Sequence, residues 1–230
     1  MSAARVRGWF VTGTDTGVGK TVVACALLRA VRARGFEVGG IKPIETGVGP
    51  EGPLDALALR EAAGNGDPIE IVCPQRFALP AAPQVAARHE QRVIDWSWID
   101  SAFEQLSLGR RYLVAEGAGG LLVPFDAETT MLDLAERWEL PLLIVARAAL
   151  GTINHTRLTL EVARRRGVAI AGVVVSHTDG KLSQADDENL RVLHDELGDI
   201  WVGEIPPLAL GEEPASDALN LDALLGAADR

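Results

Sequence analysis

Phe-Val-Thr-Gly-Thr-Asp-Thr-Gly-Val-Gly-Lys-Thr, at residues 10–21, begins with apolar side chains, continues through small ones and ends in Gly-Lys-Thr. An apolar helical pattern starts directly after it. This layout is typical of a strand that runs through a phosphate-binding loop into a helix. Successive backbone N–H groups in such a loop can surround an anion, and the positive end of the following helix adds to the attraction. The segment therefore predicts a nucleoside triphosphate site.

Two side chains at the end of this loop have the chemistry that phosphate binding requires. Lys20 would place a positive charge beside the β- and γ-phosphates, and the Thr21 hydroxyl would coordinate Mg²⁺. The loop departs from the usual pattern at one position, because Thr14 stands where a glycine is expected and the glycine is Gly13. A turn that only connects a strand to a helix is the alternative, and the Gly-Lys-Thr at the junction argues against it.

Apolar runs alternate with amphipathic stretches along the chain. We expect strands at 8–12, 36–42, 112–115, 142–146, 169–175 and 200–203, and helices at 21–34, 54–63, 85–89, 96–106, 129–138, 151–166, 183–197 and 220–227. Residues 43–53 are expected to form a loop and residues 64–84 to be irregular. The alternation predicts a single P-loop NTPase-like α/β domain over residues 1–230, with a mostly parallel central sheet flanked by helices on both faces.

The composition narrows the function classes. Among 230 residues the net charge is −10 at pH 7, so neither a nucleic acid nor a membrane is expected as a partner, and small molecules are favoured. Cys25 and Cys73 are far apart and lack nearby paired histidines, which argues against a disulfide or a zinc site. The chain shows no leader-like start and no run of 18 apolar residues. We therefore expect a soluble cytoplasmic protein.

Several polar residues follow predicted strands, where ligands bind in open α/β sheets. Lys42 would direct a second cation at the γ-phosphate, whose charge spreads over its oxygens during transfer. Asp55 and Glu116 are the best candidate carboxylates for Mg²⁺, which takes one or two protein carboxylates together with phosphate oxygens. The helix start at Gly151–Asn154 is a candidate second anion site. Because Lys42, Glu116, Gly151–Asn154 and the phosphate loop all fall just after predicted strands, we expect them to converge on one edge of the sheet.

Each of these residues also has a purely structural interpretation. Lys42 alone is more typical of a surface lysine at a strand end. Asp55 alone could equally be an acid favoured by the dipole of its helix. Gly151–Asn154 alone is more typical of an ordinary helix cap, and His155 is assigned no catalytic role.

Six segments together resemble dethiobiotin synthetase, the ATP-dependent cyclo-ligase family of biotin biosynthesis. They are Val-Thr-Gly-Thr-Asp-Thr-Gly-Val-Gly-Lys-Thr (11–21), Lys-Pro-Ile-Glu-Thr-Gly (42–47), Leu-Asp-Ala-Leu-Ala-Leu (54–59), Glu-Gly-Ala-Gly-Gly (116–120), Leu-Gly-Thr-Ile-Asn-His (150–155) and Gly-Glu-Ile-Pro (203–206). They occur in the order of the family and span nearly the whole chain. The displaced glycine of the loop is also the variant of that family.

The resemblance implies a reaction and assigns residues to it. 7,8-Diaminopelargonate, CO₂ and ATP would give dethiobiotin, ADP and phosphate through a carbamic–phosphoric anhydride. The phosphates would be surrounded by Gly17, Val18, Gly19, Lys20, Thr21 and Val22, and the nucleotide would be bordered by Gly117, Ala118 and Gly119. Mg²⁺ would be held by Thr21, Asp55 and Glu116, and the transferring phosphoryl group would be stabilised by Lys20 and Lys42. The substrate would be contacted by Thr46, Gly151, Thr152, Ile153 and Asn154. Positioning and electrostatics would supply most of the rate.

The sequence departs from the family pattern at two places. Gly17 occupies a position where some members carry an acid. Ser176 and His177 stand where members commonly carry an Asn-Asp pair that recognises the base, so the base preference stays open. Pro206, Pro207 and Leu208 are expected to line the base, with Glu213 as a weaker candidate. The family also implies a homodimer whose substrate site is completed across the interface, although the sequence does not identify the residues that cross it.

Two other function classes share features of this sequence. A partner-regulated P-loop switch ATPase of the partitioning and division-site kind usually carries a second lysine early in the loop, where this chain has Asp15, Thr16 and Gly17. An amidating ligase with the same ATP site, such as a cobyrinate amidating enzyme, needs a glutaminase domain, for which this chain is too short.

Overall fold

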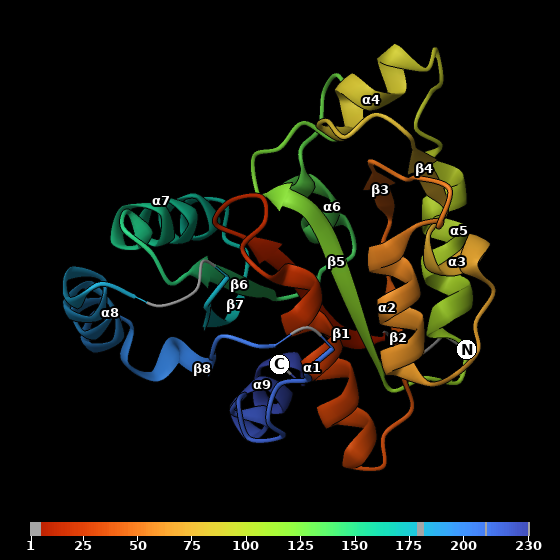
Figure 1. The fold of residues 1–230 in the computed structure, drawn as a ribbon. Coiled ribbons are helices and arrows are strands. Elements are labelled where there is room, and N and C mark those ends of the chain that lie inside the picture. The colour runs from red at the N-terminus through yellow and green to blue at the C-terminus, as the bar shows by residue number, and fades with distance from the viewer. Residues whose placement is uncertain (1–5, 179–181, 210, 230) are drawn as a thin grey trace.

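Six parallel strands form the central sheet of the protein. The computed structural model describes residues 6–178, 182–209 and 211–229. The strands are β1 (Arg7–Gly13), β2 (Val38–Ile41), β5 (Tyr112–Gly120), β6 (Leu142–Arg147), β7 (Ile170–Ser176) and β8 (Trp201–Ile205). They lie in the order β2-β5-β1-β6-β7-β8, and every neighbouring pair is parallel (Figure 1). The expected parallel α/β architecture is confirmed.

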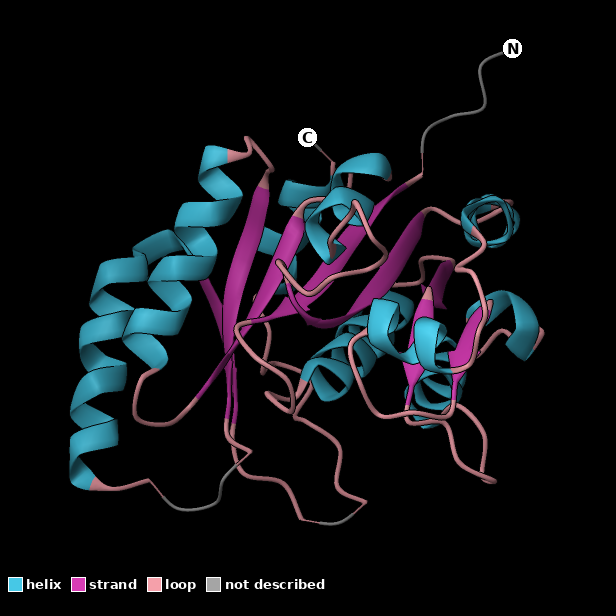
Figure 2. Cartoon of the chain, turned by 90° about the horizontal axis from the view of Figure 1, so that it is seen from above, coloured by secondary structure: helices cyan, strands magenta, loops and turns pink. Residues whose placement is uncertain are grey.

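Helices cover both faces of this sheet (Figure 2). One face carries α1 (Lys20–Ala33), α2 (Leu54–Ala63) and α9 (Leu221–Ala228); the other carries α5 (Trp96–Ser107), α6 (Met131–Arg137), α7 (Thr152–Arg165) and α8 (Gln184–Leu197). Successive strand side chains point to opposite faces. In β1, Val11 therefore packs into the core beneath α1, whereas Phe10 packs into the core on the α6 side. No described helix is both long and apolar enough to cross a membrane.

A second, two-stranded parallel sheet lies beside the main one, in the stretches expected to be loop or irregular. It pairs β3 (Ile44–Thr46) with β4 (Gln75–Phe77). In sequence, α3 (Ile69–Val72) precedes β4 and α4 (Pro83–His89) follows it. The expectation for residues 43–53 and 64–84 was therefore wrong in part. Strands of three residues are too short to show a hydrophobic period, and their pairing joins segments far apart in sequence.

Strand β5 continues well beyond its predicted end at residue 115. Its last residue, Gly120, pairs with Gly13 at the start of the phosphate loop. A Cβ atom on Gly117 would lie only 2.8 Å from the Phe10 ring, so the absence of a side chain lets this part of the strand pack closely. Glu116 is therefore inside a buried strand and not at its tip.

Candidate active site

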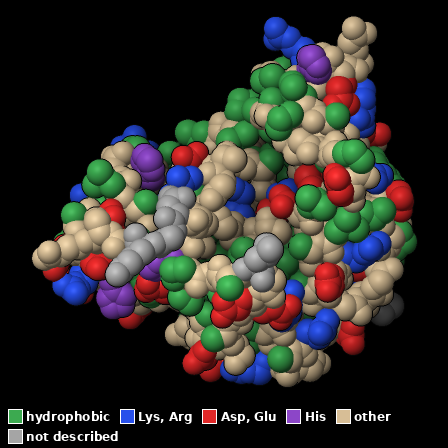
Figure 3. Space-filling model, viewed as in Figure 1, with side chains coloured by type: hydrophobic (Ala, Val, Ile, Leu, Met, Phe, Trp, Pro, Cys, Tyr) green, Lys and Arg blue, Asp and Glu red, His purple; other side chains and the backbone are tan. Residues whose placement is uncertain are grey.

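A cavity of about 400 Å³ lies at the carboxyl edge of the main sheet, next to the phosphate loop. The molecule is hollowed between the part that carries α2, β3 and β4 and the part that carries α7 and α8 (Figure 3). The cavity is lined by Thr16, Gly17, Gly19, Lys20, Thr21, Val22, Lys42, Ile44, Glu45, Thr46, Asp55, Glu116, Ala118, Gly119 and Thr178. The predicted phosphate, metal and charge-stabilising residues other than Val18 thus converge on one place, as expected.

The phosphate loop ends in a left-handed glycine that starts α1. Gly19 has a φ of 89°, and a Cβ atom there would lie 2.4 Å from Ser176 Oγ. Among the described residues no side chain caps the first turn of α1, so its backbone N–H groups can face an anion. Lys20 Nζ donates to the carbonyl of Asp15 at 3.2 Å, within the same loop. Backbone and lysine together form a cradle for phosphate.

Four side chains meet beside this loop, from α1, α2, β5 and the link between β2 and β3. Glu116 Oε1 accepts from Thr21 Oγ1 at 2.9 Å and from Lys42 Nζ at 2.5 Å. Lys42 Nζ also lies 2.7 Å from Asp55 Oδ2. Lys42 and Glu116 are buried and Asp55 is part-exposed. The candidate catalytic lysine therefore contacts both candidate metal acids directly.

Burial and mutual attraction shift the proton affinities in this cluster. Burial opposes the charge of Lys42, but the attraction of Glu116 and Asp55 outweighs it and raises the pKa of Lys42 above its usual value. The same pairing outweighs burial at Asp55 and lowers the pKa of its carboxyl. Burial raises the pKa of Glu116, with Lys42 acting against it. Burial and the nearby Lys42 charge lower the pKa of Lys20. A cationic Lys42 thus faces the two acids.

The cluster has the donor set of a magnesium site. Mg²⁺ prefers oxygen ligands, and Thr21, Asp55 and Glu116 supply a hydroxyl and two carboxylates. The second carboxylate oxygen of Glu116, Oε2, is buried and has no hydrogen-bond partner within residues 6–178, 182–209 and 211–229. A buried acceptor of this kind fits an ion or its bound water.

Other predicted residues lie outside the lining of this cavity. Val18 is buried under the loop, and Gly117 lies within β5. His177 Nε2 lies 2.6 Å from Glu204 Oε1, and Glu213 forms an ion pair with Arg29. Also outside the lining are Ser176, Pro206, Pro207, Leu208, Gly151, Thr152, Ile153 and Asn154. The helix start expected at Gly151 is nonetheless present, because α7 begins at Thr152.

Two charged residues at the cavity or its phosphate loop, Glu45 and Arg147, were not predicted from the sequence. Glu45 belongs to the quoted segment 42–47 but was assigned no role there. It lines the cavity and is 7% exposed. Arg147, the last residue of β6, donates to the carbonyl of Thr16 at 2.9 Å and so contacts the phosphate loop. A charged residue directly after a buried run was the signal that could have identified Arg147.

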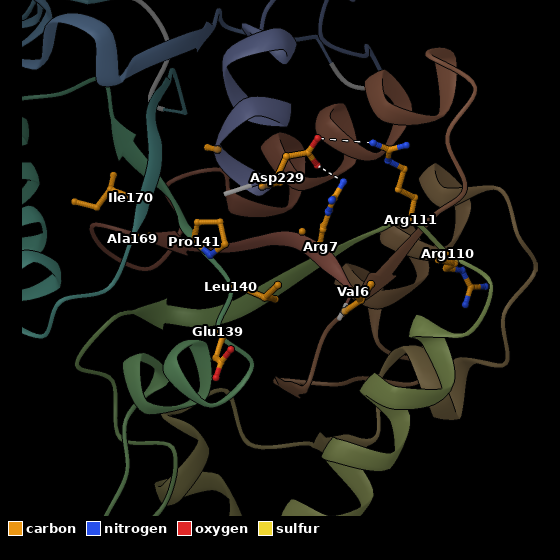
Figure 4. A pocket seen from close by; sticks show the side chains of 13 residues that line it. Val6, Arg7, Arg110, Arg111, Glu139, Leu140, Pro141, Ala169, Ile170 and Asp229 are labelled. Atoms are coloured by element: carbon orange, nitrogen blue, oxygen red, sulfur yellow. Dashed lines mark hydrogen bonds and ion pairs between the residues drawn. The ribbon is translucent and has the colours of Figure 1, made fainter. Parts of the chain in front are cut away.

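A larger cavity, about 700 Å³, lies at the other end of the strands (Figure 4). Arg7 and Arg111 both point toward Asp229 in its wall, with the Arg7 pair at 3.0 Å. This cavity contains none of the loop residues and adjoins the amino ends of the strands. Ligands of open α/β sheets bind at the carboxyl ends, which favours the smaller cavity as the active site.

Solved structures share this fold at low sequence identity. The MinC:MinD cell division protein complex of Aquifex aeolicus matches with a TM-score of 0.59 and 15% identity, over 98% of this chain and 96% of that chain. A putative plasmid partition protein of Borrelia burgdorferi bound to AMPPNP matches with a TM-score of 0.57 and 12% identity, over 97% and 98%. Likeness at this identity concerns the fold alone.

Sequence relatives are much closer. A family profile described as an AAA domain matches residues 7–215. Proteins named ATP-dependent dethiobiotin synthetase BioD are 47% identical in Anaeromyxobacter dehalogenans (96% of this chain, 98% of the relative) and 38% identical in Thermodesulfovibrio yellowstonii (87% and 89%). The Aquifex aeolicus protein of that name is 41% identical, over 74% and 76%. On this similarity over most of its length, the chain belongs to the ATP-dependent dethiobiotin synthetase family.

Proposed function

We propose that the chain converts 7,8-diaminopelargonate, CO₂ and ATP into dethiobiotin, ADP and phosphate. The family membership gives the reaction, and one structural observation supports it above others. Lys20, Lys42, Thr46 and the acids Asp55 and Glu116 line a single cavity next to the phosphate loop. Such a site can hold a triphosphate and an organic anion side by side.

The chemistry begins with a carbamate. One amine of the substrate adds to CO₂ and loses a proton, and a carbamate oxygen then attacks the γ-phosphorus while the bond to ADP breaks. The second amine attacks the carbamate carbon, loses a proton, closes the five-membered ring and expels phosphate. The carbamate is already an anionic nucleophile, so this chain does not need a histidine base for the transfer step.

Lys20 and Lys42 supply the positive charge for this transfer. Charge accumulates on the γ-phosphoryl oxygens and the leaving oxygen, and fixed cations stabilise it without reorganisation. The carboxylates of Asp55 and Glu116 keep Lys42 protonated. Thr46, at the end of β3, would orient the carbamate end of the substrate. We propose that Thr21, Asp55 and Glu116 hold Mg²⁺, which when bound neutralises phosphate charge.

We further propose that the working protein is a homodimer. Gly151–Asn154, the expected substrate segment, lies outside the cavity of its own subunit. Leu122 and Leu158 are 58% and 57% exposed and border a recess shared with loop residues 13–16. A second copy covering this apolar recess could bring its α7 start to the substrate. Light scattering would then give about twice the mass of one chain, and a monomer at working concentration would contradict the proposal.

We also propose that the nucleotide base is recognised by residues at and beyond the ends of β7 and β8. Ser176, His177, Pro206, Pro207, Leu208 and Glu213 lie on β7 and the segments that follow β7 and β8. Because His177 is held by Glu204, the His177→Ala variant tests whether discrimination between ATP and other nucleotides depends on this pair. We place the reaction in the cytoplasm, where ATP is available.

One assay tests the function. Purified protein is mixed with the diamine, bicarbonate, MgCl₂ and ATP, and phosphate release is measured with and without the diamine. We expect release that depends on the diamine, together with formation of dethiobiotin. Release that ignores the diamine would favour the second candidate, a switch ATPase, which the fold likeness alone supports. No release with any nucleotide tried would reject the ligase function.

A further inference from the structure

The Glu45 carboxylate forms hydrogen bonds with the first turn of α2. Its Oε1 accepts from the backbone N–H of Asp55 at 3.1 Å, and its Oε2 accepts from the N–H of Ala56 at 3.0 Å. The residue that precedes the helix, Pro53, provides no side-chain cap. Because the first N–H groups of a helix have no partner within it, a carboxylate from β3 satisfies two of them here.

This contact is specific in both charge and shape. A carboxylate at a helix N-terminus is favoured by the helix dipole, and hydrogen bonds to an ionised acceptor are stronger than neutral ones. Each oxygen of Glu45 takes a different N–H. Two bonds from one planar group fix the position of the helix start and also its rotation. Glu45 is buried, so water competes little for the contact.

This first turn of α2 carries Asp55, one of the candidate metal acids. Asp55 is the second residue of α2, and its side chain reaches Lys42 at 2.7 Å. Lys42 in turn contacts Glu116 on β5. Lys42, directly after β2, and Glu45, within β3, lie three residues apart. The same short stretch of chain therefore carries the lysine and the carboxylate that holds the helix presenting Asp55.

We propose that Glu45 is a positioning residue for magnesium, which sets Asp55 in register with Thr21 and Glu116. The inference rests on the proposed function, because it concerns the same site. Glu45 has both oxygens engaged by backbone N–H groups and therefore acts through Asp55. Outer partners of metal ligands typically contribute about 10–100-fold to metal affinity.

The test compares nucleotide binding with and without the metal. Calorimetry measures the Kd of ADP in millimolar Mg²⁺ and again in EDTA, for the wild type, Glu45→Gln and Glu45→Asp. The amide replaces one acceptor by an NH₂ group, and the shorter acid cannot reach both N–H groups. Glu61→Gln, an exposed position on the same helix, is the matched control.

Mg²⁺ should lower the Kd of ADP in the wild type, and we expect this decrease to be about tenfold smaller in both Glu45 variants. The Kd of ADP in EDTA should stay as in the wild type. The magnesium concentration for half-maximal turnover should rise in parallel, and Glu61→Gln should change neither. A purely structural role would lower the melting temperature and leave the effect of Mg²⁺ intact, which would overturn the proposal. Diamine-dependent phosphate release by the wild type is scored separately, so failure of the proposed function is distinguishable.

Discussion

Replacing Lys42 with methionine removes the cation that faces Glu116 and keeps most of the side-chain volume. Glu116 is fully buried, with Oε1 2.5 Å from Lys42 Nζ, whereas the side chain of Asp55 is 41% exposed and can be solvated by water. Breaking a buried pair by removing one partner costs about 3–5 kcal/mol. Lys20 lines the same cavity and offsets part of the loss. We therefore expect the free energy of unfolding at neutral pH to fall by about 3 kcal/mol.

Urea unfolding followed by circular dichroism measures this loss. For a chain of this size it corresponds to a drop in Tm of about 6–12 °C. The pH dependence has a definite sign. Without Lys42, burial raises the pKa of Glu116 in the folded state above its unfolded value, so the folded state binds the extra proton. The free energy of unfolding of the variant should then increase as the pH falls through that raised pKa.

The double variant Lys42→Met/Glu116→Gln provides the control. It removes both charges, so no buried carboxylate is left without its partner, and we expect it to recover most of the lost stability. A single variant as stable as the wild type would refute the reasoning. So would a double variant that is less stable than the single one. Turnover should fall by about 10²–10³-fold in Lys42→Met, because the transferring phosphoryl group loses a fixed cation.

Three further predictions concern other parts of the molecule. Gly19→Ala should abolish nucleotide binding in calorimetry with little change in circular dichroism, since a Cβ there would lie 2.4 Å from Ser176 Oγ at a φ of 89°; unchanged affinity would contradict this. Although partial burial opposes it, bonding to Thr130 and Arg166 lowers the pKa of Asp133 to about 2. The Asp133 carboxylate therefore stabilises the folded state fully above the pKa of the unfolded state, near 3.8, and this contribution is lost as the pH falls toward 2. Asp133→Asn should cost about 1 kcal/mol at pH 7 and flatten the urea-derived profile in that window. Burial raises the pKa of Cys25 to about 12, so a thiol reagent should label it only in urea, and rapid labelling of the native protein would argue against this burial.

The long elements could be predicted because their patterns are local. The apolar run 142–146 became β6, and the amphipathic stretch 183–197 became α8 with Leu190 and Leu193 buried, as the spacing indicated. The convergence of Lys42 and the phosphate loop also followed from the sequence, because parallel strands place their carboxyl ends at one edge. Asp55 joins them from helix α2, and Glu116 joins them from within β5.

What could not be predicted depends on distant partners. Strands β3 and β4 are three residues each and exist only because they pair with one another. Whether Lys42 would face solvent or the two acids depends on side-chain packing across three elements. The Glu45 carboxylate accepts hydrogen bonds from backbone N–H groups of α2. A pattern of side chains in the sequence does not reveal a contact with the backbone.

The position of β1 within the sheet has a consequence for how the chain folds. β1 pairs with β5 on one side and β6 on the other, so Arg7 meets Tyr112 and Phe10 meets Leu142. Its neighbours β5 and β6 begin only at Tyr112 and Leu142, so about half of the 230 residues are made before β1 can pair. Contacts between such distant segments slow folding, because the entropy of closing the loop is lost before the contacts form. The nascent chain therefore carries an unpaired apolar strand during synthesis, and unpaired strand edges of this kind are prone to aggregate.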